Sequence, residues 1–179
     1  MRRLPSVCHT PSTLKFVEDA YVTTSVSQQA FRETLALWPS GVTVVTAQHD
    51  GVRLGMTVSS FSSLSLDPPL VLACIAKSAK SHDGIVEAAG FAIHVLSRTQ
   101  EDVSRLFARP GPEKFNDIAT TDGLFDVPLL HLGVARLVCA HHEAVVGGDH
   151  TILIGRVLEV DRTDQPPLIY WDRDYRSAT

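Results

Sequence analysis

The sequence lacks the patterns that would assign it to a nucleic-acid-binding or membrane class. Its 179 residues carry a formal net charge of −4 and no block of basic residues. This argues against a nucleic-acid partner, because such modules normally present a basic patch. The longest apolar run, residues 70–76, is far shorter than the roughly 20 residues of a membrane-spanning helix. Polar residues and prolines soon after Arg3 replace the apolar stretch that an export signal requires.

Cysteine is scarce, and Cys8, Cys74 and Cys139 are odd in number and widely spaced. This usage is typical of buried thiols in a reducing compartment, so we expect a cytoplasmic protein. Apolar surroundings raise the pKa of a thiol, and no Gly-x-Ser-x-Gly nucleophile motif is present. Covalent catalysis is therefore not expected. The Gly-x-Gly-x-x-Gly fingerprint of a dinucleotide-binding Rossmann fold is missing as well.

One alternating cluster, Cys139, His141 and Glu143, raises the question of a metal ion. Residues at i, i+2 and i+4 share one face of a strand, but they spread over about 13 Å. A single ion cannot reach all three side chains, so we expect no metal site.

The length suits one domain with a substantial core. Residues 1–26 show no sustained periodicity and are interpreted as a leader that is partly disordered, followed by a domain over residues 27–179. Ser27 is a candidate N-cap for a short amphipathic helix, which ends near Pro39 and Gly41.

The rest of the domain reads mainly as strands joined by turns. We expect strands over residues 42–47, 52–60, 70–76, 91–96, 134–145, 151–160 and 168–171. Short helices are expected over residues 85–89 and, from a Ser97–Gln100 capping box, over residues 97–108. Residues 113–130 are interpreted as a long surface excursion and the residues after Trp171 as a polar tail. The pattern predicts a mostly β fold with short helices, an antiparallel barrel that is closed or nearly closed.

A dense group of hydroxyl side chains lies between two apolar runs, in residues 55–70. Its hydroxyls and backbone amides can cradle a phosphate or a polar heterocycle. In an antiparallel barrel the turn after Phe61 and the loop after Ala76 can lie at the same end, which would bring Ser78, Lys80 and Ser81 to this group. A solvated serine-rich loop with unremarkable lysines is the alternative.

A second candidate is His150, which follows the turn Gly147-Gly148-Asp149. Its imidazole can bind a ligand, donate a hydrogen bond, or gain and lose a proton near neutral pH. A turn histidine that points into solvent is the alternative.

Several stretches taken together resemble the flavin reductase-like family with the FMN-binding split barrel, the reductase component of two-component flavin-dependent monooxygenases. The resemblance runs from about Phe31 to Tyr175. It rests on residues 40–46, 55–70, 91–96, 148–151, 154–157 and 167–170, together with Tyr175.

The resemblance implies a homodimeric, antiparallel split β-barrel that reduces FMN or FAD with NADH or NADPH and passes reduced flavin to a partner monooxygenase. It implies flavin contacts from Thr57, Ser59, Ser60, Phe61 and Ser63, and a phosphate loop of Ser78, Lys80 and Ser81. It places His150 beside the nicotinamide as an orienting and electrostatic residue, and it implies nucleotide contacts from Arg173, Tyr175 and Arg176. A flavin-binding electron carrier or sensor without reductase activity, and a ligand-binding barrel without a cofactor, are the alternatives.

Overall fold

The computed structural model describes residues 25–111, 113–131 and 133–177. The expected leader, residues 1–26, lies almost entirely outside the described residues, and the domain boundary at residue 27 stays a prediction. Within the described part the chain is mostly β, as expected, and its strand pairs are antiparallel. No helix in this part is long and apolar enough to cross a membrane.

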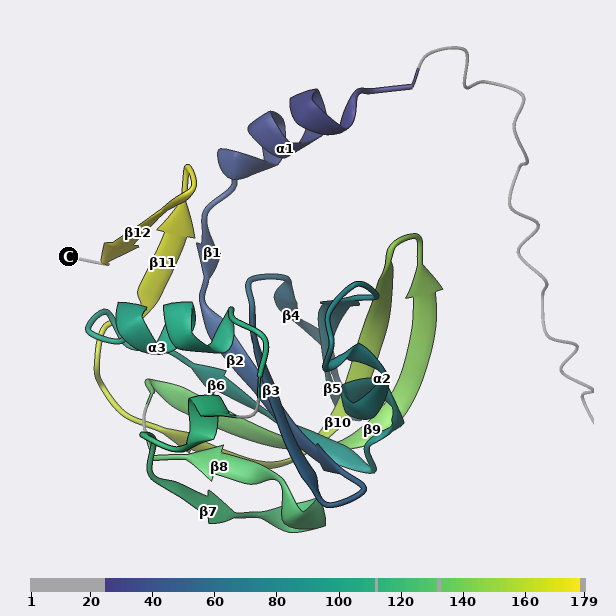
Figure 1. The fold of residues 1–179 in the computed structure, drawn as a ribbon, viewed down its shortest axis with the longest axis vertical. Coiled ribbons are helices and arrows are strands. Elements are labelled where there is room, and N and C mark those ends of the chain that lie inside the picture. The colour runs from purple at the N-terminus through teal and green to yellow at the C-terminus, as the bar shows by residue number, and fades with distance from the viewer. Residues whose placement is uncertain (1–24, 112, 132, 178–179) are drawn as a thin grey trace, which may run out of the picture.

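A curved seven-stranded sheet forms the body of the molecule, in the order β3-β2-β6-β9-β10-β5-β4 (Figure 1). Its strands are β2 (Thr43–His49), β3 (Val52–Val58), β4 (Phe61–Leu66), β5 (Pro69–Ala76), β6 (Gly90–Val95), β9 (Ala135–Gly147) and β10 (His150–Arg162). The β-branched residues 42–46 favour the extended backbone of β2. Asp50 and Gly51 adopt the positive φ that a two-residue hairpin turn requires.

The hydroxyl-rich stretch, residues 55–70, differs from the expectation of a turn after Phe61. Residues 61–66 form the edge strand β4, which pairs with β5, so the expectation of a turn there is wrong. The pairing register shifts between Ser63 and Ser65, as at a β-bulge. A bulge breaks the period-two alternation by which a strand is recognised in sequence, which explains why this strand was missed.

A smaller three-stranded sheet stands beside the large one and is built from both ends of the described chain (Figure 1). Its order is β1 (Ser40–Gly41), β11 (Leu168–Trp171) and β12 (Asp174–Ser177). The expected polar tail is therefore a strand: the turn at Asp172 and Arg173, both with positive φ, folds it back onto β11. Helix α1 (Gln28–Ala36) begins after the predicted N-cap Ser27, whose hydroxyl accepts the N–H of Ala30.

The expected surface excursion, residues 113–130, is instead partly buried. It contains the 3-10 turns η1 (Glu113–Phe115) and η2 (Leu124–Asp126), and the short paired strands β7 (Thr120–Asp122) and β8 (Pro128–Leu130). Val127, Leu129 and Leu130 are buried, and the first two pack with Ala92 and Val138 of the main sheet. Four consecutive residues without charge, 127–130, are what makes this burial favourable.

Two larger hydrophobic clusters stabilise the fold. One lies within the curved sheet around Ile75, Phe91 and Leu153, and the other joins Phe107 to Leu168 of β11. The remaining helices are α2 (His82–Glu87) and α3 (Glu101–Phe107). The predicted capping box is half present: the Ser97 N–H donates to Gln100 Oε1 over 2.8 Å, but the residue at the N-cap is Gln100 itself.

A buried histidine ties β6 to β2 and β8. Thr46 donates its hydroxyl hydrogen to the Pro128 carbonyl (2.7 Å), so its oxygen accepts from His94 Nε2–H (3.0 Å). His94 Nδ1 is buried and has no hydrogen-bond partner among the described residues. Burial, reinforced by the charge of Arg136, lowers the pKa of His94 to about 3. His94 is therefore neutral in the folded protein.

We predict that His94 makes the protein acid-sensitive. Its pKa is depressed on folding, so its contribution to stability is complete above about pH 6.5 and is lost as pH falls toward 3, because the unfolded chain then binds the proton first. The loss is about 1.4 kcal/mol per pH unit at its steepest. Urea unfolding between pH 4 and 7 should show a flatter dependence of the unfolding free energy in His94→Gln, whereas the exposed-site control His142→Gln should keep the wild-type slope.

Candidate functional site

A pocket of about 680 Å³ lies between β3, the loop before α2 and the end of α3. It gathers three segments that are far apart in sequence. Its lining residues are Val52, Arg53, Leu54, Gly55, Met56, Thr57, Ser78, Ala79, Lys80, Ser81, Phe107, Ala108, Arg109, Pro110, Gly111 and Lys114. Four of the residues proposed from sequence, Thr57, Ser78, Lys80 and Ser81, therefore meet here.

The pocket is strongly cationic for a chain whose net charge is negative. Arg53, Lys80, Arg109 and Lys114 line it, and none of its described lining residues is acidic. Arg53 is held to Asp122 over 2.8 Å, which neutralises part of its charge. Three further cations and several hydroxyls remain, and this combination favours an anion such as a phosphate.

Gly55 allows an aromatic wall to approach β3 closely. A Cβ atom at this position would lie 2.7 Å from Phe107 Cε1 and 3.1 Å from the Phe115 ring. Phe107 is only 1% exposed, and the two rings pack edge to face with centroids 5.3 Å apart. Any larger residue at position 55 would displace this wall of the pocket.

A chain of hydroxyl groups joins Thr57 to the C-terminal strand. The Thr57 hydroxyl donates to the Ser104 carbonyl over 2.7 Å, and Ser104 Oγ lies 2.8 Å from the Tyr175 hydroxyl. Tyr175 also packs edge to face on Tyr170, and the Arg105 guanidinium lies 5.0 Å from its ring centre. Tyr175 thus supports the helix that lines the pocket and does not line the pocket itself.

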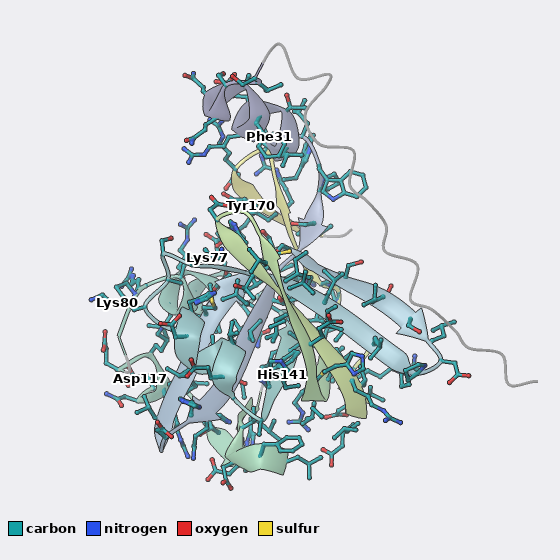
Figure 2. The ribbon with its side chains drawn as sticks, turned by 90° about the vertical axis from the view of Figure 1, so that its right-hand side faces the viewer. Phe31, Lys77, Lys80, Asp117, His141 and Tyr170 are labelled. Carbon is teal, nitrogen blue, oxygen red and sulfur yellow. The ribbon has the colours of Figure 1, made fainter. Side chains whose placement is uncertain are left out.

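The loop before α2 is fixed to the β9–β10 hairpin. The Lys77 N–H donates to the Asp149 carbonyl (3.0 Å), and Lys77 Nζ donates to the Gly148 carbonyl (2.7 Å). At the start of α2, His82 Nε2 lies 2.8 Å from Thr151 Oγ1. Figure 2 shows Lys77 and Lys80 on the same side of the molecule, with Lys80 at its rim. The proposed phosphate loop is therefore a supported turn, not a free loop.

His150 lies at the turn end of the same hairpin, opposite Ala76 in the ladder. Its Nδ1 is 2.8 Å from Asp149 Oδ1, and this hydrogen bond lowers the pKa of the Asp149 carboxyl. A carboxylate can only accept a hydrogen bond, so Nδ1 carries a hydrogen. Nε2 is the ring nitrogen that remains to interact with a ligand. The His150 side chain is 42% exposed and does not line the pocket, although it sits beside the loop that does.

The remaining hydroxyls of the β3–β4 region lie outside the pocket. Ser60 Oγ bonds the backbone of Cys74, accepting from its N–H (3.2 Å) and lying 3.0 Å from its carbonyl oxygen. Ser59 and Ser63 are exposed, and Phe61 is half-buried against the core. Ser60 therefore has a structural role in holding β4 beside β5, whatever else it contacts.

The two arginines of the C-terminal hairpin also lie away from the pocket. Arg176 pairs with Asp174, and this hydrogen bond lowers the pKa of the Asp174 carboxyl. Arg173 occupies a left-handed turn position and is exposed. Within a single copy of the chain, the residues of the proposed phosphate loop therefore lie in one pocket with Thr57. Arg173 and Arg176 lie outside this pocket.

Sequence reasoning missed Arg53, Phe107, Arg109 and Lys114. Arg109 follows the end of the helix expected over residues 97–108, and Lys114 belongs to the expected surface excursion of residues 113–130. Lys114 is 6% exposed, and its Nζ donates to the carbonyls of Gly55 (2.9 Å) and Arg109 (2.6 Å). Phe115, the aromatic residue next to Lys114, is a signal in the sequence that this segment returns to the core, and it packs against the cluster that contains Phe107.

Comparison with protein families matches residues 35–179 to the family described as "Flavin reductase like domain". The chain is 42% identical over 153 residues to an FMN reductase (NADH) of Agrobacterium fabrum, a match that covers 86% of this chain and 87% of that protein. It is 40% identical over 127 residues to the reductase component of a flavin-dependent trigonelline monooxygenase of Acinetobacter baylyi. That match covers 70% of this chain and 41% of that protein, so the chain spans under half the length of this relative.

Solved structures share the fold as well. An NADH:FAD oxidoreductase of Streptomyces globisporus, in complex with NAD and FAD fragments, superposes with a TM-score of 0.81 at 35% identity. The match covers 86% of this chain and 93% of that chain. The expected fold class, an antiparallel split barrel with short helices, is confirmed.

Proposed function

The chain belongs to the flavin reductase-like domain family, and we propose that it is an NAD(P)H:flavin oxidoreductase that supplies reduced FMN or FAD to a flavin-dependent monooxygenase. The relatives named as an NADH-dependent FMN reductase and as a monooxygenase reductase component support this activity and this class of partner. The observation on this chain that carries the proposal is the cationic, hydroxyl-lined pocket beside β3.

The pocket suits the phosphate end of a flavin nucleotide. Ser78 and Ser81 offer hydroxyls, Lys80 offers a point charge, and Thr57 lies on the strand that forms the opposite wall. When bound together, a reduced nicotinamide and a flavin supply the hydride donor and acceptor, so no catalytic base is needed from the protein. The protein has to hold the nicotinamide and flavin rings in position to react and to exclude water.

We assign the flavin contacts to Thr57, Ser59, Ser60, Phe61 and Ser63, and the phosphate contacts to Ser78, Lys80 and Ser81. His150 is the residue proposed to orient the nicotinamide. Its hydrogen bond with Asp149 fixes the ring orientation, which supports a positioning role. Arg173, Tyr175 and Arg176 are proposed to hold the nucleotide. Because Tyr175 is engaged with Ser104 in the same chain, its part in that contact is indirect.

The activity is tested by adding NADH and FMN to the purified protein and following absorbance of the reduced nicotinamide. Rapid loss of NADH that depends on flavin is the expected result, and repeating the assay with NADPH and FAD defines the preferred pair. A bound flavin that is indifferent to both nucleotides would identify an electron carrier or sensor instead. Neither flavin binding nor nucleotide oxidation would identify a barrel without a cofactor.

We predict that His150→Ala slows flavin reduction at least tenfold and leaves the dissociation constant of oxidised flavin unchanged within about twofold, because losing one preorganised polar group typically affects the chemical step. Stopped-flow reduction at saturating flavin and NADH measures the first quantity, and flavin fluorescence titration measures the second. The exposed-site variant His142→Ala serves as the control. Loss of flavin binding with normal turnover at saturating flavin would contradict this role.

We also propose that the protein is a homodimer in which α1 packs against a second copy. None of the residues of α1 is buried, yet Phe31, Leu35 and the following Trp38 lie on one helical stripe with exposures of 57%, 52% and 75%. The helix stands off the rest of the chain, with Phe31 far from the barrel (Figures 1 and 2). Its attachment is to β11, through hydrogen bonds from the Asp172 N–H and the Trp171 indole.

A stripe of this kind is costly to leave in water, since burial of each large side chain contributes about 1.5–3 kcal/mol. We predict that the double variant Phe31→Ser, Leu35→Ser raises the dimer dissociation constant at least about a hundredfold. Light scattering coupled to size exclusion should give twice the mass of one chain for the wild type and for Gln29→Ser, on the opposite face of α1. A wild-type protein that stays monomeric at high micromolar concentration would rule out the dimer.

A further inference from the structure

Lys114 is a buried cation for which no carboxylate partner is found in the described part of the chain. Both groups that accept hydrogen bonds from its Nζ are backbone carbonyls, those of Gly55 and Arg109. Its nearest aromatic contact, the Phe107 ring at 5.7 Å, adds only a weak attraction. Burying an ammonium without a counter-ion is expensive, so such a charge calls for a compensating anion or a functional reason.

The position of Lys114 indicates where that anion would come from. The residue lines the cationic pocket together with Lys80 and Arg109. An ammonium has three N–H groups, and two of those of Lys114 are taken by carbonyls on the pocket wall. One N–H remains for an acceptor in the pocket. The side chain is 6% exposed, so its charge acts on a ligand with little screening by water.

We propose that Lys114 is the specificity-determining residue that makes this pocket select phosphorylated flavins over riboflavin, by donating its third N–H to the flavin phosphate. This rests on the proposed flavin reductase function and adds a residue and a ligand class to it. The two carbonyl bonds hold the ammonium in place before the ligand arrives, so little side-chain entropy is lost on binding. Exposed Lys80 lacks this preorganisation and contributes mainly long-range attraction.

The titration behaviour of Lys114 agrees with this geometry. Burial lowers its pKa, and only the neighbouring Glu113 acts in the opposite direction. The other charged groups that line the pocket, Arg53, Lys80 and Arg109, have the same sign as Lys114. A phosphate dianion in the pocket would favour the ammonium form and so raise this pKa again.

The test compares FMN with riboflavin, which share the ring and differ in the phosphate. Dissociation constants are measured by flavin fluorescence titration for the wild type, Lys114→Met and Lys114→Gln, the last of which keeps an N–H donor without the charge. We expect both variants to weaken FMN binding about 10- to 100-fold and riboflavin binding less than about threefold, the range of one charge-assisted hydrogen bond. The control Arg98→Gln removes an exposed charge outside the pocket and should change neither constant by more than about twofold.

An equal loss for FMN and riboflavin would overturn the proposal, because Lys114 would then only support the pocket wall, and so would no loss for either. If neither variant folds, the wild type decides: its preference for FMN over riboflavin, followed from neutral pH up to the highest pH at which the protein stays folded, should fall as Lys114 loses its proton. A constant preference over that range would overturn the proposal. Failure of the proposed function is a separate result, since it appears as absence of flavin-dependent NADH oxidation in the wild type.

Discussion

The pairing of β10 with β5 is the constraint on which the site depends. Seven consecutive residue pairs, from His150 opposite Ala76 to Arg156 opposite Leu70, fix the register between these strands. The loop that follows Ala76 is thereby held at the turn before β10, where Lys77 bonds the backbone of residues 148 and 149. A slip of one residue would turn the buried side chain of Leu153 outward, so the core enforces this register. The geometry of the loop before α2, the proposed phosphate loop, is thus a consequence of core packing.

The second feature is the distribution of charge: the electrostatic field in the pocket has the opposite sign to the net charge of the chain. The whole chain is acidic, yet four cations meet in one pocket and no described lining residue opposes them. Among the described lining residues, only Arg53 is paired with a carboxylate, that of Asp122 in β7. Low-dielectric walls such as Phe107 concentrate the remaining field at the pocket mouth. Net charge argued against a nucleic-acid partner, but it gave no information about this local concentration of positive charge.

The sequence was informative where residue type alone determines structure. Local physical causes account for three observed features: the strand at the β-branched residues 42–46, the turn at Asp50 and Gly51, and the N-cap at Ser27. It was uninformative where distant segments meet. The bulge in β4, the burial of residues 127–130 and the return of Lys114 to Gly55 depend on tertiary contacts that no local pattern encodes. The sequence therefore predicted that Ser78, Lys80 and Ser81 lie near Thr57, as they do in the pocket, whereas Arg109 and Lys114 were not expected there.

These distant contacts also couple the shape of the pocket to its charge. The segment after α3 is held against β3 by the same ammonium whose charge faces the pocket, through the carbonyls of Gly55 and Arg109. Gly55 leaves room for Phe107 and Phe115 to pack at this junction, and Phe107 in turn is 5.7 Å from Lys114. A neutral side chain at position 114 would lose the field, and one without an N–H donor would lose the clamp as well. Separating the two effects requires ligands that differ in the phosphate, because the charge acts on the ligand whereas the clamp acts on the pocket wall.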